Sequence, residues 1–201
     1  MNNTMRITLA ALVLAGAPFF AAPAAAQSVA SAVTKLDLDK CRHTAGKAEE
    51  DYGEWRCGGC GGIPVHVSAG DQRSYVSFGR NAKKELAAQQ TLASFNGEGE
   101  TIEWRGERGA GGKLKPFAAI MPWSTTISGG DEPVRGRMLV VTRLGPGGVC
   151  HVGYVDAKAN DDAAALARKI ADETARTFKC GLDKSIILGK RGPAFSGPAA
   201  D

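Results

Sequence analysis

The chain has 201 residues, of which 43% are hydrophobic and 23% are charged, and its formal net charge at pH 7 is +4. These values match a soluble globular protein and exclude a disordered chain, a coiled coil and a polytopic membrane protein. The positive charge is small and scattered along the chain, which argues against a nucleic-acid-binding protein. The 26 glycines predict many tight turns.

The first 26 residues have the features of a secretory signal peptide. Arg6 supplies a basic start, Ile7–Phe20 is almost wholly apolar, and Ala24–Ala26 forms a small-residue cleavage site. The apolar run is shorter than the ~20 residues that cross a bilayer. We therefore predict export to the periplasm or secretion, with no transmembrane segment after cleavage. Residues 27–35 are small and polar and are expected to form a flexible lead-in.

The central part of the sequence is rich in strand signals. Pro64–Ser68 and Arg73–Phe78 flank a Gly-Asp turn and predict a β-hairpin. Asn81–Gln90 has the composition of a helix, and Thr101–Arg105 alternates polar with apolar residues, as a half-buried strand does. Three further strands are expected at Phe117–Trp123, Arg137–Arg143 and Val149–Asp156, the last two joined by a hairpin loop at Gly145–Gly148.

A helix follows the last of these strands. Asn160 is expected to cap it, and Leu166, Ile170 and Phe178 recur at helical spacing on one face. The charged residues of the other face are spaced for i,i+4 ion pairs within the helix. Residues 190–201 are rich in Gly, Pro and Ala and are expected to be disordered. The sequence thus predicts one globular α+β domain over residues 36–189, an antiparallel β-meander packed against a long C-terminal helix.

All five cysteines follow the predicted cleavage site. In an oxidising compartment disulfides are the expected state, and an odd number leaves at least one thiol unpaired. We expect two structural disulfides, Cys41–Cys57 and Cys150–Cys180, with Cys60 as a free or labile thiol. Because neighbouring partners cannot be separated by sequence, Cys41–Cys60 stays open as an alternative pair.

Cys57-Gly58-Gly59-Cys60 also suggests redox or metal chemistry. A redox C-x-x-C motif lies at a helix N-terminus, which stabilises the thiolate, whereas Gly61–Val67 is typical of a turn that enters a strand. A zinc ribbon would need a second C-x-x-C pair, which the sequence lacks. We therefore predict no metal and no cofactor, and we keep thiol–disulfide chemistry at Cys57 and Cys60 as an alternative function.

The chain resembles a family of uncharacterised exported proteins of proteobacteria, over most of residues 36–189. The family has no assigned activity, so the resemblance implies an envelope location but no catalytic residue. Four cysteines fall on family positions, whereas Cys60 departs from the pattern, which argues against redox chemistry as the family's function. The matching segments are Leu36–Cys41, Trp55–Cys57, Gly62–Val65, Gly70–Arg73, Val76–Gly79, Thr101–Arg105, Phe117–Ile120, Trp123, Gly153–Ala157, Ala159-Asn160, Leu166–Arg168 and Phe178–Gly181.

The remaining candidate site residues are aromatic or titratable. His66 and His151 alternate with apolar neighbours and are expected on the less buried faces of their strands, where either could be a general base. Glu103 and Asp156 could form a carboxylate pair on neighbouring strands. Core packing is the expected role of Trp55, Trp104 and Trp123, although two of them on one exposed face could form a binding surface together with the histidines.

These patterns favour a non-enzymatic protein that binds an unidentified envelope component or protein. An inhibitor of a protease or a lysozyme is one specific form, although the basic charge of the chain complements a lysozyme poorly. The alternatives are the thiol–disulfide protein described above and a small hydrolase built on His66 or His151. The sequence alone identifies neither the ligand nor the oligomeric state.

Overall fold

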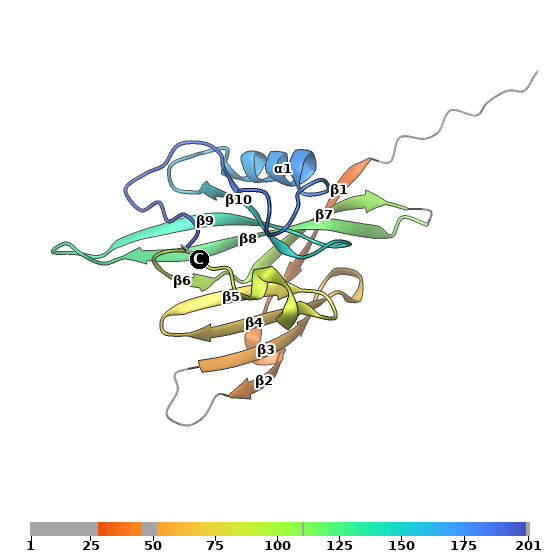
Figure 1. Ribbon diagram of the computed structural model, residues 1–201, viewed down its shortest axis with the longest axis horizontal. Helices are drawn as coiled ribbons and strands as arrows, with labels where there is room; N and C mark the ends of the chain where they lie inside the picture. The colour runs from red at the N-terminus through yellow and green to blue at the C-terminus, as the bar shows by residue number, and fades with distance from the viewer. Residues whose placement is uncertain (1–27, 46–51, 110, 200–201) are drawn as a thin grey trace, which may run out of the picture.

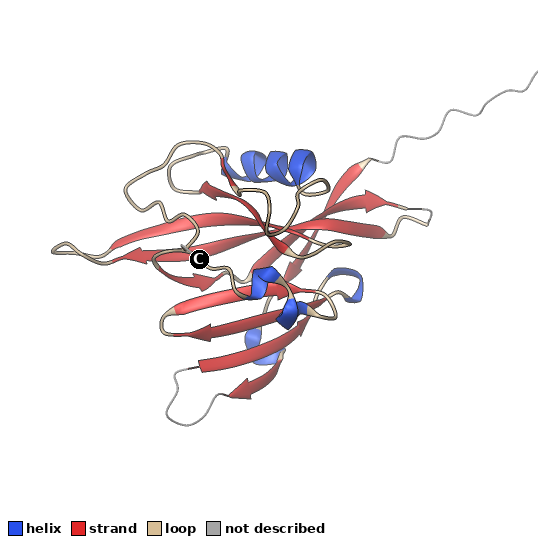
Figure 2. Ribbon diagram, in the orientation of Figure 1, coloured by secondary structure: helices blue, strands red, loops and turns tan. Residues whose placement is uncertain are grey.

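Two β-sheets and one helix are stacked in three layers, with the large sheet in the middle (Figure 1). The computed structural model describes residues 28–45, 52–109 and 111–199, so the predicted signal peptide lies outside the described residues. The described residues are mostly β with one α-helix, which is consistent with a mixed α+β fold. Figure 2 shows the helix on one face of the large sheet and the small sheet on the other.

Seven of the described strands form the large sheet, in which β6 pairs with β8 beside the main strand order. All neighbours are antiparallel except β10 and β11. The main order is β1 (Val29–Lys35), β7 (Thr101–Arg108), β8 (Leu114–Ile127), β9 (Val134–Arg143), β10 (Cys150–Asp156) and β11 (Ile186–Ile187), with β6 at Phe95–Glu98.

The small sheet is antiparallel and contains the predicted hairpin. Its strands lie in chain order: β2 (Arg42–Ala45), β3 (Tyr52–Gly58), β4 (Pro64–Gly70) and β5 (Arg73–Phe78). The hairpin turn uses Asp71 and Gln72, both with positive φ, which is the conformation of a type I′ turn. The strands therefore form two sheets and not the single meander that the sequence predicts.

Each face of the large sheet covers a separate hydrophobic core. On β8, Ala119, Met121 and Trp123 pack against the small sheet, while Ala118 and Ile120 pack against the helix. Since both faces are buried, the central strands carry continuous apolar runs where a half-exposed strand would alternate. This explains why Phe117–Trp123 is recognisable as a strand from its sequence.

Two segments expected to be flexible are ordered. The lead-in forms β1, in which every residue from Val29 to Lys35 pairs with β7. In the tail, the Ala199 N–H donates to the Thr91 carbonyl, and the Gly197 carbonyl accepts from Ala93, each at 3.0 Å. For the described residues 28–35 and 190–199 both predictions are wrong, because backbone hydrogen bonds to distant segments order these residues and composition does not report such bonds.

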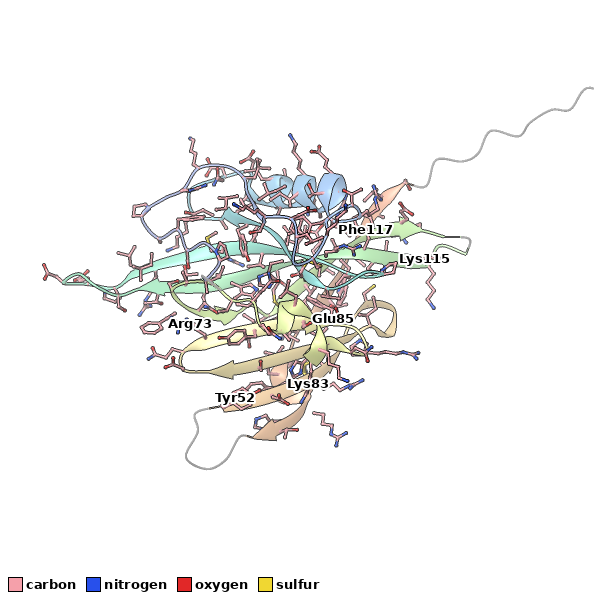
Figure 3. All side chains as sticks on the ribbon, in the orientation of Figure 1. Tyr52, Arg73, Lys83, Glu85, Lys115 and Phe117 are labelled. Carbon is pink, nitrogen blue, oxygen red and sulfur yellow. A yellow bond between two sulfur atoms is a disulfide. The ribbon has the colours of Figure 1, made fainter. Side chains whose placement is uncertain are left out.

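The predicted helix at Asn81–Gln90 is wrong in its type. The segment forms two 3₁₀ turns, η3 (Ala82–Lys84) and η4 (Leu86–Ala88), because Glu85 between them is extended. The Glu85 carboxylate accepts the Val149 N–H at 2.9 Å, and the Ala87 N–H donates to the Val149 carbonyl at 2.9 Å. These bonds fix the segment against the start of β10. Glu85 is labelled in Figure 3.

The long C-terminal helix is shorter than expected and begins later. Helix α1 spans Ala163–Thr174, and Asn160 is not its cap. The Asn160 amide donates to the Asp156 and Lys190 carbonyls, each at 2.9 Å, and its oxygen accepts the Lys190 N–H at 2.8 Å. Asn160 therefore fastens the chain after the helix to the chain before it.

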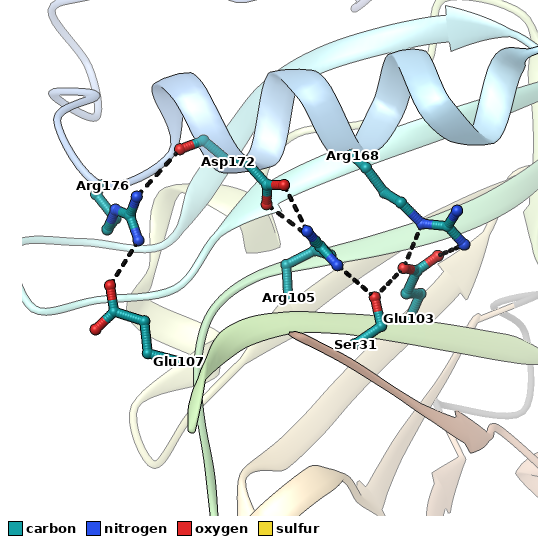
Figure 4. A network of polar contacts seen from close by, with 7 residues as sticks. All are labelled: Ser31, Glu103, Arg105, Glu107, Arg168, Asp172 and Arg176. Carbon is teal, nitrogen blue, oxygen red and sulfur yellow. Dashed lines mark hydrogen bonds and ion pairs between the residues drawn. The ribbon is translucent and has the colours of Figure 1, made fainter. Parts of the chain in front are cut away.

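The charged face of the helix packs on β7 and does not form the predicted ion pairs within the helix. Arg105 on β7 pairs with Asp172, and Glu103 on β7 pairs with Arg168 (Figure 4). Ser31 on β1 links both pairs, because its hydroxyl donates to Glu103 and accepts from Arg105. Arg176, just after the helix, pairs with Glu107 at 2.7 Å. The helix is thus held to the sheet by polar contacts along its flank.

Candidate functional site

A cleft of about 580 Å³ lies beside β10, a volume typical of small-molecule sites. Its walls come from four segments that are far apart in the sequence: the end of η4, β10, the chain after α1, and the C-terminal segment. The lining residues are Leu86, Gln89, Gln90, Thr91, Cys150, His151, Tyr154, Phe178, Gly181, Leu182, Asp183, Lys184, Ser185, Ile187, Pro198 and Ala199.

A β-bulge places two polar side chains together in this cleft. His151 is opposite Thr142 of β9 and Gly153 is opposite Val141, so Val152 is an extra residue with no partner. In a regular strand, positions i and i+3 face opposite sides, but the bulge brings His151 and Tyr154 to the same face. The His151 Nδ1 lies 3.0 Å from the Tyr154 hydroxyl oxygen.

His151 is fully enclosed yet incompletely hydrogen-bonded. The side chain is 1% exposed, and its ring meets those of Trp123 and Tyr154 edge-on, at centroid distances of 5.9 and 5.7 Å. Its backbone N–H donates to the Gln90 Oε1 at 2.7 Å. Its Nε2 has no hydrogen-bond partner in the described part of the chain. A buried polar atom without a partner costs about 1–3 kcal/mol and therefore needs an explanation.

Burial keeps this imidazole uncharged. It lowers the pKa of His151 to about 3, far below the ordinary value of about 6.5. The ring is therefore neutral at physiological pH, and in this form one ring nitrogen can donate a hydrogen bond while the other can accept one. A base with so low a pKa is poorly matched to proton transfer near pH 7, so hydrogen bonding is the chemistry that the residue can supply.

Covalent and polar links hold the outer wall of the cleft to its floor. The Cys150–Cys180 disulfide joins β10 to the segment after α1. The buried Arg143 guanidinium donates to the Phe178 carbonyl at 2.8 Å and to the Pro146 carbonyl at 2.7 Å. These links fix the wall independently of any ligand, so the cleft is preformed.

The cysteines have the expected partners. Cys41–Cys57 and Cys150–Cys180 are the two disulfides, and Cys60 is a half-buried free thiol. The open alternative, Cys41–Cys60, is therefore wrong. Because the Cys57 sulfur is bonded to Cys41, the C-x-x-C segment does not hold a Cys57–Cys60 disulfide. Among the described residues there is no cluster of three or more His, Cys, Asp or Glu that could hold a metal ion.

The histidine predictions are correct about strand phase but wrong about exposure. His66 and His151 do lie opposite their apolar neighbours, yet His66 is 7% exposed and His151 is 1% exposed. The face of β10 that carries His151 packs in the core between the sheets. The face of β4 that carries His66 lies against Lys83 and the rest of the η3 segment. A polar side chain that alternates with apolar neighbours does not reveal from sequence that its own face of the strand is covered.

The tryptophans do not form one binding surface. Trp104 and Trp123 are fully buried between the sheets, and the Trp104 Nε1–H donates to the Thr34 hydroxyl at 2.8 Å. Trp55 is half-buried and stacks on exposed His43, with ring centroids 4.7 Å apart. The expectation of core packing therefore holds for Trp104 and Trp123.

The proposed carboxylate pair does not form. Glu103 lies on β7 and Asp156 on β10, and β8 and β9 separate them. Asp156 is 1% exposed and accepts backbone N–H groups from Lys158 and Gly192, each at 2.9 Å. Glu103 is paired with Arg168. Both carboxylates thus have structural roles.

Comparison of the chain with protein-family models, curated proteins and solved structures finds no match. Within the described ranges, no helix is both long and apolar enough to cross a membrane. The two disulfides are consistent with an oxidising compartment outside the cytoplasm. The functional assignment therefore depends on the cleft itself.

Proposed function

We propose that this chain is a non-enzymatic periplasmic binding protein, a member of the exported proteobacterial family that its sequence resembles, and that its ligand occupies the cleft at His151. The observation that carries the proposal is the buried His151 Nε2, which has no partner within the described chain. Because this nitrogen is closed to solvent, the proposal requires that the ligand displace the side chains that cover it. The hydrogen bond to the ligand would then remove the desolvation cost of Nε2 and fix the ligand's orientation.

The lining of the cleft defines the chemical class of the ligand. The polar groups nearest His151 are uncharged, namely the Tyr154 hydroxyl and the Gln90 amide, and Leu86 and Phe178 add apolar wall. Charges lie on exposed residues of the outer wall. This arrangement favours an uncharged, largely apolar molecule that carries one hydrogen-bonding group, such as an alcohol, a carbonyl or an amide.

The two enzymatic alternatives have less support. A hydrolase would use His151 as general base, but an imidazole with a pKa of about 3 is a weak base for reactions near neutral pH. A thiol–disulfide protein would use Cys57 with Cys60, but Cys57 is already bonded to Cys41. Neither objection applies to a binding protein.

The test is a small-molecule screen on the mature protein, read by thermal shift and followed by NMR of ¹⁵N-labelled histidine. A ligand of the proposed class should shift the His151 ring nitrogen signals in the wild type. Binding should be lost in the His151→Phe variant, which fills the space without the nitrogen. The matched control is His43→Phe, because His43 is exposed on the small sheet and should leave binding unchanged.

Two results would contradict the proposal. One is a ligand that binds His151→Phe as tightly as the wild type, and the other is a ligand whose contacts map away from the cleft. Circular dichroism of each variant distinguishes lost binding from lost folding.

A further inference from the structure

A second pocket, with no lining residue in common with the cleft, lies on the outer face of the small sheet. Its volume is about 190 Å³, and basic side chains line it. Arg56 on β3 and His66 on β4 come from the sheet. Arg80, Lys83 and Lys84 come from the segment after β5. Figure 3 shows Lys83 beside this sheet.

The strand register aligns the floor of this pocket. Arg56 is opposite His66 across β3 and β4, and His66 is opposite Ser77 across β4 and β5. Val65 and Cys57 belong to the core between the sheets, so the adjacent His66 and Arg56 point to the other face. Directly opposite residues have Cβ atoms about 4.5–5.5 Å apart, so the three side chains form one row.

The positive charges of the pocket are mostly uncompensated. Lys83 is ion-paired with Glu54, whose other carboxylate oxygen accepts the Tyr52 hydroxyl at 2.7 Å. Within the described residues, Arg56, Arg80 and Lys84 have no ion-pair partner. Like charges that converge on one small pocket repel each other and attract an anion.

Two buried polar groups are opposite each other across β4 and β5, and one of them, His66, lines the pocket. His66 is 7% exposed, and the Ser77 hydroxyl is fully buried with no hydrogen-bond partner in the described chain. The pKa of His66 is lowered, first by burial and then by the positive charges of Lys83 and Arg56, against the opposing effect of Glu54. An anion in the pocket would offset those two cations and favour the imidazolium.

We infer that this pocket binds a phosphate-type oxyanion, as free phosphate or as the phosphate group of an anionic lipid. Arginine side chains bind phosphate through two parallel hydrogen bonds, and lysine binds it as a point charge. The volume equals that of roughly six water molecules, which is room for such an ion with part of its hydration shell. The inference is independent of the ligand proposed for the cleft.

The test uses inorganic phosphate and sulfate in isothermal titration calorimetry at low ionic strength. Arg80→Gln and Arg56→Gln should each weaken binding about tenfold, the loss expected for one charge-assisted hydrogen bond. Lys115→Gln is the matched control, because it removes an exposed cation on β8 in the large sheet. Should an arginine variant fail to fold, Lys84→Gln at an exposed position of the pocket rim gives the same test.

Sulfate also tests the part played by His66, because the charge of sulfate is the same at pH 5.5 and at pH 7.5. Sulfate should bind more tightly at pH 5.5 than at pH 7.5, and His66→Gln should remove that difference. The charged groups around His66 are Glu54 and Arg56 on β3 and Lys83 on η3. Arg80 and Lys84, from the segment after β5, line the same pocket. Lys83 lowers the pKa of Glu54, which therefore stays ionised over this range.

Vesicles separate the two sources of phosphate. Vesicles of phosphatidylcholine with and without phosphatidylglycerol are sedimented with the protein, and inorganic phosphate is added as competitor. Retention on the anionic vesicles that phosphate reverses indicates a lipid headgroup, and calorimetric binding without retention indicates free phosphate. Either result supports the oxyanion site. The inference is overturned if neither ion binds, or if the arginine variants bind as tightly as Lys115→Gln.

Discussion

Lowering the pH from 7 to 5 should destabilise the protein through His151. The pKa of His151 is about 3 in the folded chain, and an unfolded chain has a histidine pKa of about 6.5. Between these values the unfolded chain binds a proton that the folded chain does not bind. Above pH 6.5 the imidazole is neutral in both states and the free energy of unfolding does not depend on it. Below pH 6.5 the proton binds to the unfolded chain alone, so the free energy of unfolding falls as the pH falls.

The size of the effect follows from the same two values. A pH of 5 lies about 1.5 units below the pKa of the unfolded imidazole. At about 1.36 kcal/mol per unit, the free energy of unfolding falls by about 2 kcal/mol. The result does not depend on the folded pKa as long as that value stays well below 5. The lowered pKa values of Glu54 and Glu103 act only below about pH 4.5, outside this window. The lowered pKa of His66 adds a loss of the same sign.

The assay is urea unfolding at pH 7 and pH 5, followed by tryptophan fluorescence. Because His66 contributes in both proteins, the quantity that matters is the difference between the wild type and His151→Phe. The wild type should lose about 2 kcal/mol more than the variant. Tyr154→Phe retains the buried imidazole and should keep the wild-type pH dependence. Equal losses in the wild type and His151→Phe would refute the reasoning.

Three further predictions concern stability at pH 7, each measured as a free energy of unfolding in urea. Arg105→Met should cost about 2 kcal/mol, because it leaves a half-buried carboxylate without its two-point partner. Gly153→Ala should cost about 1–3 kcal/mol, because the new Cβ would lie 2.8 Å from the Ile186 carbonyl oxygen. Replacing Cys150 and Cys180 by alanine should cost about 4 kcal/mol, from the 30-residue separation of the pair.

Each of these predictions has a matched comparison. Arg176→Met removes a more exposed ion pair and should cost less than about 1 kcal/mol, so an equal cost for the two arginines would contradict the role given to Arg105. Gly58→Ala adds a methyl group where no atom lies within 4 Å and should be tolerated. Removing the Cys41–Cys57 disulfide should cost about 3 kcal/mol, because its ends are only 16 residues apart. A loss below 1 kcal/mol from either cysteine pair would contradict the entropic estimate.

The parts of the fold that the sequence predicts are those in which local pattern and tertiary role agree. Phe117–Trp123 is apolar throughout because both of its faces are buried. Val76 and Phe78 alternate with Ser77 because only the two apolar side chains face the core between the sheets. Val29–Lys35 has no such pattern, since an edge strand of small residues is defined by its ladder to β7. Glu85 likewise divides a segment of helical composition into two 3₁₀ turns, and its carboxylate accepts the N–H of the distant Val149.

The candidate site was only partly predictable for a similar reason. His151 is recognisable as a titratable residue on a strand, but its partnership with Tyr154 depends on one extra residue, Val152, and no sequence pattern reports a bulge. Gln90 joins the site from a segment 61 residues earlier in the chain. The basic pocket could be predicted only as the adjacent pair Lys83-Lys84, because Arg56 reaches it through the strand register.

The Cys150–Cys180 disulfide has a consequence for the maturation of the protein. It connects the floor of the cleft to the segment that forms its outer wall, so a newly made chain with reduced thiols lacks that connection. A ligand encountered at that stage would have to order the wall at its own entropic cost, and it would bind more weakly. Reduction of this disulfide is therefore expected to weaken binding of the ligand proposed for the cleft.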